Sequence, residues 1–407
     1  MSVHVTPAAA TSFLRAMLRI ESLSGSEFAL AAFLREAMTD LGLDAHVDAV
    51  GNAVGVRGEV RGEVRGDGHG DGPNQADRPR EILLLGHMDT VPGKIDVRID
   101  NGRLFGRGAV DAKGPLAAMI IAAASARLPQ GVRVRVVGAV EEESASSRGA
   151  RHIARGPRPD VCVIGEPSAW DGITLAYKGR LLVRARVETS SSHSAGPDAT
   201  AAELGADLWQ TIHAGAKAIK PDPGVQLPPG QLTTFASVQS RLRSFQTHSD
   251  GLHDAADLLM GFRLPPGVAP ETLEAVCRRA ADHVRDVGVR PDNPISLTLN
   301  FEGHEHAFVA PRDTPLVRAF STAIRHLGGR PALRYKTGTS DMNVVGPAWN
   351  PDPGVATCPL IAYGPGDSRL DHTPDEHIPL DEFIRGINVL RHAIELVAAE
   401  LAEREPK

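Results

Sequence analysis

The stretch EILLLGHMDT, residues 81–90, decides the fold, because an apolar run ends abruptly in polar residues. Such a run is typical of a strand buried on both faces of a sheet. A strongly apolar helical segment from Pro115 to Leu128 follows, and then two more apolar runs. Strands that alternate with helices pair in parallel, so the sequence predicts an α/β fold with a mixed, largely parallel sheet. The two later runs are VRVRVVGAV (132–140) and VCVIG (161–165).

The composition excludes several classes of protein. A chain of 407 residues is long enough for two or three domains. Its 42% hydrophobic and 23% charged residues are typical of a soluble globular protein. A net charge of -6 and a pI near 6.2 provide no basic field for nucleic acid or an anionic membrane. The chain has neither a membrane-spanning apolar run nor a signal peptide pattern, so we expect a cytoplasmic protein without nucleic-acid or membrane partners.

Two features of the sequence resemble metal or redox sites, but a simpler interpretation is favoured for both. The cysteines Cys162, Cys277 and Cys358 lie far apart, which fits reduced thiols rather than disulfides or a thiolate zinc site. The Gly-, Asp- and Arg-rich tract at 58–80 contains His69 and several aspartates. It has almost nothing to bury, and no other coordinating segment lies nearby in the sequence. We therefore expect a solvated surface loop.

The remaining pattern predicts a second domain inserted into the first. A strand at 180–190 alternates polar and apolar residues, as a half-exposed strand does. Two helices and three further strands follow up to residue 303, in a β-α-β-β-α-β-like order. We expect a catalytic domain of residues 1–179 and 302–407 and a ferredoxin-like α+β lid of residues 180–301. Other expected elements are a helical segment at 11–41 ended by Gly42, a strand at 45–56, helices at 200–218, 270–287, 315–327 and 380–403, and a strand at 358–364.

The chemistry-bearing residues follow the predicted strands. His87 and Asp89 come after the first strand, the acidic triplet Glu141–Glu143 after the second, and Glu166 after the third. Ligands bind at the carboxyl ends of the strands in open α/β sheets, so these side chains can converge. Asp111 precedes the apolar helix, and His372 follows the last predicted strand.

Carboxylates and imidazoles are suitable ligands for a catalytic zinc or a similar divalent ion. Two histidines and three carboxylates would hold two adjacent ions if one carboxylate bridged them. A single His or Glu of this kind is usually structural. Five metal-capable groups at one edge of a sheet, however, favour a metal centre.

These residues lie in motifs that resemble a known family. In order, the motifs are GHMDTVPG, GRGAVDAKGP, EEES with RGAR, GEPS and DHTPDE. They are similar to those of the two-zinc metallopeptidases that include acetylornithine deacetylase and succinyl-diaminopimelate desuccinylase. The resemblance implies a zinc-exopeptidase-like catalytic domain, an inserted lid that commonly forms the dimer, and metal-assisted amide hydrolysis.

The resemblance also implies a role for each residue. His87 and Glu166 would bind one metal ion, His372 the other, and Asp111 would bridge them. Asp89 would orient His87, because a metal-bound imidazole needs an acceptor for its other N–H. The bound ions would be zinc, with cobalt possible, and their water would be the nucleophile.

The acidic triplet can be aligned in two registers. Direct alignment makes Glu142 the general base and Glu143 a ligand of the second ion, and the distance to Gly149 favours this register. A shift by one residue would assign these roles to Glu141 and Glu142.

Further residues are candidates for substrate contact. The resemblance implies that His193, in SSSHSAGP, stabilises the oxyanion from the neighbouring subunit. Arg263, in FRLPP, is a candidate for a bidentate contact with a substrate carboxylate, although an ordinary surface arginine is nearly as good an interpretation. The segment KTGTSDMN offers Lys336, Thr339, Ser340 and Asp341, which could bind a carboxylate and a cationic amine or could simply stabilise a turn.

The motifs specify the reaction more closely than the substrate. Together with KTGTSDMN they look most like the hydrolases that release lysine or ornithine from the amino-group carrier protein LysW in lysine and arginine biosynthesis. One alternative is a deacylase of small molecules, such as acetylornithine or acetyllysine, a desuccinylase or a dipeptidase. Another is a catalytically silent metal-binding scaffold, and the intact set of acidic residues and histidines weighs against it.

Overall fold

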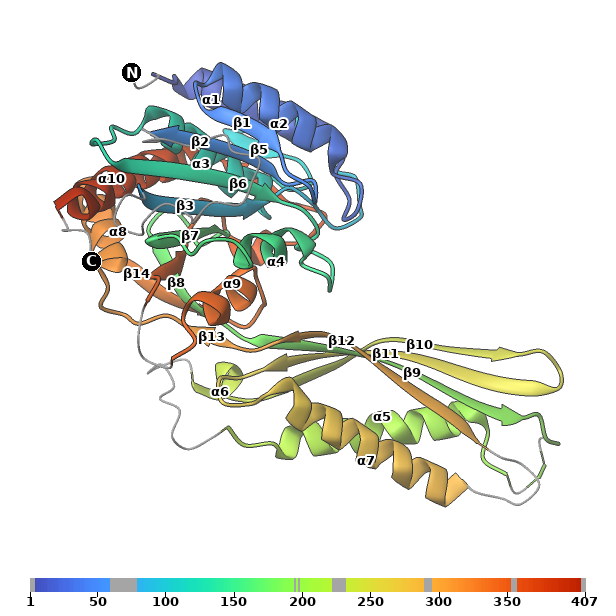
Figure 1. Ribbon diagram of the computed structural model, residues 1–407. Coiled ribbons are helices and arrows are strands. Elements are labelled where there is room, and N and C mark those ends of the chain that lie inside the picture. Colours follow the sequence, from blue (N-terminus) through green and yellow to red (C-terminus); the bar gives the residue numbers. More distant parts are fainter. Residues whose placement is uncertain are drawn as a thin grey trace, which may run out of the picture. The chain divides into compact units, whose positions relative to one another are not determined.

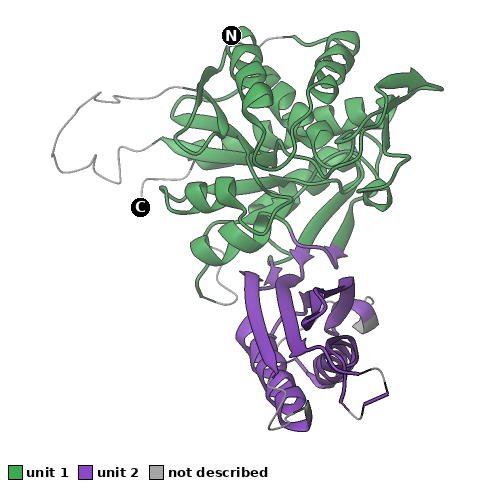
Figure 2. Ribbon diagram, turned by 90° about the vertical axis from the view of Figure 1, so that its right-hand side faces the viewer, with its two compact units in different colours: residues 1–175, 310–334, 340–407 green, residues 176–309, 335–339 purple. Residues whose placement is uncertain are grey.

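The computed structural model describes residues 4–58, 79–193, 195–196, 198–221, 232–288, 295–352 and 357–403. The chain forms two compact units, shown in different colours in Figure 2. Unit 1 comprises residues 1–175, 310–334 and 340–407, and unit 2 comprises residues 176–309 and 335–339. Most of the tract at 58–80, expected to be a surface loop, lies outside the described residues. No helix in the described part of the chain is long and apolar enough to span a membrane.

A mixed sheet has its central strands in unit 1, which confirms the predicted α/β class with a mixed sheet. β6, β3, β7 and β15 pair in parallel, and the strands that flank them pair antiparallel. Among the described residues its strands run in the order β1-β2-β6-β3-β7-β15-β8-β13, and β14 pairs with β8. β3 is parallel to both β6 and β7, and its residues 81–87 are buried. The strands are β1 (Asp44–Val47), β2 (Ala53–Gly58), β3 (Arg80–His87), β6 (Val132–Ala139), β7 (Val161–Gly165), β8 (Gly172–Tyr177), β13 (Phe308–Val309), β14 (Ala332–Lys336) and β15 (Leu360–Ala362).

The start of β3 carries a buried acidic residue between two arginines. The parallel register places Glu81 opposite Arg133. The Glu81 carboxylate accepts hydrogen bonds from Arg133 Nε at 2.8 Å and Arg135 Nη2 at 2.7 Å, and the residue is 0% exposed. The charge of this carboxylate is thus compensated by two permanent cations.

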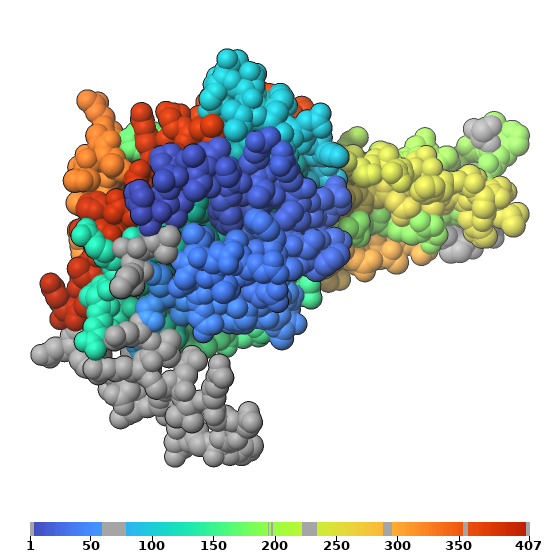
Figure 3. Space-filling model, turned by 90° about the horizontal axis from the view of Figure 1, so that it is seen from above, coloured from blue at the N-terminus to red at the C-terminus, as the bar shows by residue number. Residues whose placement is uncertain are grey.

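Two expected elements at the N-terminus are each divided. The helical segment predicted at 11–41 consists of α1 (Pro7–Arg19) and α2 (Phe28–Asp40), because Gly25 adopts a left-handed φ of 85° in a turn between them. The strand predicted at 45–56 is the hairpin of β1 and β2, whose turn is closed by the Asp48 carboxylate. Figure 3 shows this N-terminal segment, in blue, on one face of unit 1.

Helices cover the sheet of unit 1. α3 is buried along nearly its whole length and packs against β3, as its apolar composition predicts. α10 packs against α3, α8 and β3, whereas α4 and α9 pack against each other. Their bounds are α3 (Lys113–Ser125), α4 (Arg148–Ala154), α8 (Pro315–His326), α9 (Met342–Trp349) and α10 (Leu380–Glu403), with a 3₁₀ turn, η2, at Ser368–Leu370. A small sheet combines β4 (Arg98–Asp100), β5 (Arg103–Phe105) and β16 (His377–Pro379).

Unit 2 has the expected β-α-β-β-α-β order. Its antiparallel strands are arranged β10-β11-β9-β12, which is the ferredoxin-like order predicted from the sequence. α5 and α7 pack on the same face of this sheet (Figure 1), and their apolar residues form a core with β9 and β11. The elements are β9 (Gly179–Ser190), α5 (Ala201–Ala218), α6 (Leu232–Phe235), β10 (Gln239–Ser249), β11 (His253–Leu264), α7 (Pro270–Gly288) and β12 (Ser296–Glu305).

Candidate metal centre

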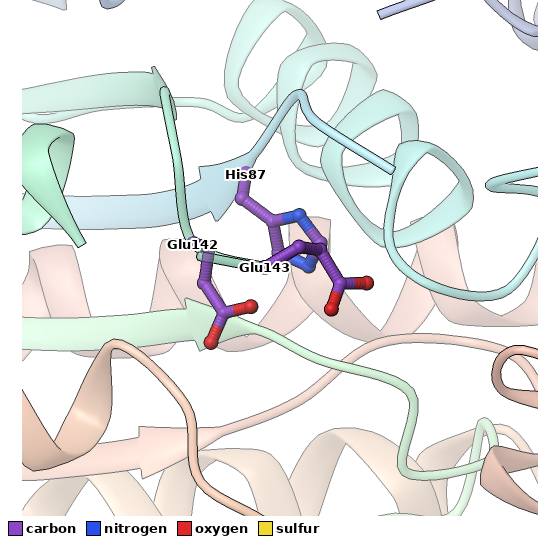
Figure 4. A group of neighbouring side chains, drawn as sticks. All are labelled: His87, Glu142 and Glu143. Carbon is purple, nitrogen blue, oxygen red and sulfur yellow. The ribbon is translucent and has the colours of Figure 1, made fainter. Parts of the chain in front are cut away.

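The carboxyl ends of three parallel strands bring the candidate ligands of unit 1 together. His87 is the last residue of β3 and pairs with Ala139, the last residue of β6. Glu142 and Glu143 follow β6 after three and four residues, and Glu166 follows β7 directly. Figure 4 shows the Glu142 and Glu143 side chains beside the His87 imidazole. The parallel pairing that the apolar runs predict therefore places these groups at one edge of the sheet.

Asp89 connects the histidine to the acidic turn. It is 0% exposed, and its Oδ1 lies 3.4 Å from His87 Nδ1. The same carboxylate accepts the backbone N–H groups of Glu142 and Glu143 at 3.1 and 3.0 Å, and Ser24 Oγ donates to it at 2.6 Å. Burial would raise the pKa of Asp89, but its hydrogen bonds, above all with His87, keep the pKa below its usual value. The Asp89 carboxylate thus holds the His87 ring and the backbone of the acidic turn together.

The orientation of His87 leaves one nitrogen for an ion. Its Nδ1 lies 3.0 Å from the carbonyl oxygen of Asp89. A carbonyl oxygen only accepts, so Nδ1 carries the proton of the neutral ring and the lone pair is on Nε2. Nε2 lies 3.3 Å from Asp111 Oδ1 and 3.9 Å from Glu166 Oε1.

Two groups of three potential ligands share Asp111. His87, Asp111 and Glu166 form one group, and Asp111, Glu143 and His372 form the other; in each, the ligand atoms lie within 4.8 Å of one another. In the second group, His372 Nε2 lies 3.0 Å from Asp111 Oδ2 and 2.9 Å from Glu143 Oε1. Each oxygen of Asp111 thus faces a different histidine. A third group combines His87 with Glu142 and Glu143.

The electrostatics of this cluster are those of a cation site. Five carboxylates gather around two histidines, namely Asp89, Asp111, Glu142, Glu143 and Glu166. Burial raises the pKa of Glu142 well above its usual value, and the carboxylates of Glu166 and Asp341 add to the effect. Burial also raises the pKa of Glu143.

Hydrogen bonds to Asp111 and Glu143 raise the pKa of His372 to about 11. The same histidine holds the pKa of Asp111 far below its usual value despite burial. Oxygen and imidazole donors with surplus negative charge fit divalent ions.

The acidic triplet turns in a way that separates its first member from the other two. Glu141 adopts a left-handed φ of 60°, and its carboxylate binds Arg148 Nε at 2.7 Å and Ser146. Glu142 and Glu143 instead belong to the cluster around His87. This geometry favours the direct register, with Glu142 as the base and Glu143 as the ligand.

Sequence reasoning missed the groups that support this turn. Glu27 is buried, and its Oε1 accepts the backbone N–H groups of Gly25 and Glu141 at 3.0 Å each. Asn52 Oδ1 accepts the N–H of Val140 at 3.0 Å. These residues and Ser24 lie in short polar turns, where no local pattern distinguishes a supporting residue from an ordinary turn residue.

The other candidate residues divide between the two units. In unit 2, Arg263 donates to Thr339 Oγ1, Thr339 Oγ1 donates to the carbonyl oxygen of Lys178 at 3.3 Å, and Lys336 Nζ lies 5.8 Å from the centre of the Tyr177 ring. His193 is exposed after β9, and its Nδ1 accepts the N–H of Ala195 at 3.1 Å. In unit 1, Ser340 and Asp341 are buried at the start of α9. The roles assigned to all of these residues stay predictions.

Comparisons with known proteins agree with this geometry. The model of peptidase family M20/M25/M40 matches residues 83–396. A protein of Deinococcus radiodurans named LysW-lysine hydrolase is 44% identical over 95% of this chain and 96% of its own length. A protein of Pyrococcus furiosus, named putative LysW-lysine/LysW-ornithine hydrolase, is 36% identical over 94% of this chain and 95% of its own. Among solved structures, an M20 family metallo-carboxypeptidase from Sulfolobus solfataricus is similar in fold, with a TM-score of 0.71, 16% identity, and coverage of 96% of this chain and 99% of that one.

Proposed function

The chain belongs to peptidase family M20/M25/M40, and from this premise we propose that it releases lysine or ornithine from the amino-group carrier protein LysW by metal-dependent amide hydrolysis. The observation that carries the proposal is the pair of ligand groups that share Asp111 at the carboxyl ends of β3, β6 and β7. The two relatives named as LysW hydrolases support the choice of substrate, because they match nearly the whole chain.

The residues fit a pair of divalent ions. His87 and Glu166 would hold one ion, Glu143 and His372 the other, and Asp111 would hold both. The absence of cysteine from these groups fits zinc or cobalt in a catalytic site rather than a structural thiolate site. When bound, two such ions lower the pKa of a water and polarise the carbonyl of the scissile amide.

The protein's own part in the reaction centres on Glu142. Its buried carboxylate belongs to neither of the two groups that share Asp111, so its oxygens are available for a proton. Glu142 takes the proton of the attacking water and delivers it to the nitrogen of the leaving amine. Asp89 meanwhile holds the His87 ring and the backbone of Glu142 in one arrangement.

We assign substrate recognition to the polar residues that the sequence offers as candidates. Arg263 and Lys336, with the hydroxyls of Thr339 and Ser340, would bind the α-carboxylate of the released amino acid. Asp341 would receive the cationic side-chain amine. His193 would donate to the oxyanion from the partner of a homodimer formed through the lid of residues 180–301.

Release of free lysine and ornithine from the aminoacylated carrier protein tests the proposal. The zinc-loaded enzyme is assayed on this conjugate and on N-acetylornithine in parallel, and the Glu142→Gln variant serves as the control for contaminating hydrolases. We expect hydrolysis of the conjugate, with little activity towards N-acetylornithine. Cleavage of N-acetylornithine alone would retain the reaction type and overturn the substrate assignment.

A further inference from the structure

A buried ion pair lies beneath the shared carboxylate of the metal centre. Glu376 is 0% exposed, and its Oε2 lies 2.7 Å from Arg107 Nη1. Its other oxygen, Oε1, accepts the backbone N–H groups of Val110 and Asp111 at 2.9 and 3.1 Å. The carboxylate thus binds the main chain of Asp111, whose own carboxylate faces both histidines.

The arginine of this pair reaches the loop that carries His372. Arg107 Nη1 donates to the carbonyl oxygen of Thr373 at 3.2 Å, and its Nε donates to that of Gly93 at 3.0 Å. Thr373 directly follows His372, which has a left-handed φ of 60°. A planar guanidinium suits this task, because its donors lie in a fixed fork and can reach several acceptors at once.

The pair therefore joins two segments that are distant in the sequence but adjacent at the metal centre. Asp111 lies just before α3, where no helical hydrogen bond fixes its backbone N–H. His372 lies in a turn after η2. Without Glu376 both N–H groups at Val110 and Asp111 would lose their acceptor in a buried position, where an unmade hydrogen bond is costly.

We propose that Glu376 and Arg107 are positioning residues that set the place of Asp111 relative to His372 and thereby the affinity for the ion held between them. The proposal rests on the metal roles proposed above for Asp111 and His372. Neither residue belongs to a group of candidate ligands among the described residues, and both oxygens of the Glu376 carboxylate already accept hydrogen bonds. Their effect reaches the ion only through the backbone that they hold.

The chain offers a matched control for this proposal. Glu81 is equally buried and is also paired with arginine, but it lies at the opposite end of β3 from His87. Glu376→Gln removes the ion pair with Arg107, and Glu81→Gln removes the two ion pairs with Arg133 and Arg135, each with little change in side-chain size. In Glu376→Gln the amide nitrogen would face the Arg107 guanidinium, and two donors cannot pair.

Zinc affinity of the full chain, stripped of metal and titrated against a chromophoric chelator, provides the test. We expect Glu376→Gln to weaken binding of at least one ion by about 10–100-fold, as losses of groups that support metal ligands do. Glu81→Gln is expected to bind both ions with the affinity of the wild type. The visible absorption spectrum of the cobalt-loaded protein should change in Glu376→Gln and not in Glu81→Gln, which separates a displaced ligand from a general loss of stability.

Two ions bound by Glu376→Gln with wild-type affinity and spectrum would overturn the proposal. If that variant does not fold, Arg107→Lys is measured instead, because it keeps the positive charge but lacks the forked donors of the guanidinium. Wild-type metal affinity of Arg107→Lys would then overturn the proposal. A wild-type protein that binds two ions yet leaves the LysW conjugate intact overturns only the proposed substrate. A wild type that binds fewer than two ions overturns the metal roles on which this inference rests.

Discussion

The two ends of β3 present the same electrostatic problem with different solutions. At the start of the strand, the buried carboxylate of Glu81 is paired with Arg133 and Arg135. At the other end, His87 and Asp89 lie among carboxylates that outnumber the available cations. Arginine side chains stay charged, so the negative charge of Glu81 is compensated within the folded protein without a bound ion. The second end depends on protons or metal ions, and this dependence marks it as the reactive end.

Replacing the shared carboxylate of Asp111 should have the largest effect on metal binding and activity at the His87 end of β3. Asp111→Asn removes the one group common to both ligand sets. We expect kcat/KM on the LysW conjugate to fall by about 10⁴-fold, as losses of essential groups do. Metal content, measured by inductively coupled plasma mass spectrometry, should drop below two ions per chain. Full metal content with normal turnover would contradict the shared role.

Replacing the proposed base should affect turnover without emptying the metal centre. Glu142→Gln keeps the shape of the side chain but cannot take a proton. We expect kcat to fall by about 10²–10⁴-fold while both ions stay bound. Steady-state kinetics and metal analysis on the same sample check this, and loss of an ion together with activity would instead make Glu142 a ligand.

Metal binding at the His87 end of β3 should depend on pH. Hydrogen bonds to Asp111 and Glu143 raise the pKa of His372 to about 11, so the chelator-stripped protein carries this imidazole protonated at pH 7. A metal ion requires the neutral ring, and binding must therefore release a proton. Affinity should rise with pH, by up to about tenfold per pH unit for each proton released. Chelator competition at pH 6, 7 and 8 measures the slope, and a flat profile would exclude proton displacement.

The smallest effect on activity is expected at the start of β3, where Glu81 is paired with Arg133 and Arg135. Glu81→Gln leaves Arg133 and Arg135 without their shared carboxylate, which should cost about 1–3 kcal/mol of stability. Differential scanning fluorimetry should show a melting temperature lower by a few degrees, while turnover of the conjugate is unchanged. A large loss of turnover here would mean that the two ends are not independent.

Much of this architecture follows from local patterns. Buried strands such as β3 and β7 are recognisable because their residues are continuously apolar, and parallel pairing then brings His87 and Glu166 together. The proposal of Glu143 rather than Glu142 as the ligand relies on the left-handed backbone at Glu141, which the residue type does not indicate. A non-glycine residue with positive φ is uncommon, so this turn could not be expected from the residue types alone.

The supporting groups could not be predicted from the sequence for a different reason. Ser24 binds Asp89, Glu27 binds the backbone of Glu141, and Glu376 binds that of Asp111. Each contact joins segments that are 65 or more residues apart in the chain. A serine or glutamate in a polar turn has the same appearance whether it supports a reactive group or faces water, so only the tertiary structure distinguishes these residues.

The spread of the ligands along the chain has a consequence for biosynthesis. His87, Asp111 and Glu166 are all translated within the first half of the sequence, but His372 comes about 200 residues later. At about 5–20 residues per second, this interval lasts roughly 10–40 s. During it, the nascent polypeptide carries one complete ligand trio and lacks the final histidine of the other. In the proposed metal centre, the second position can therefore be completed only after the C-terminal segment has left the ribosome.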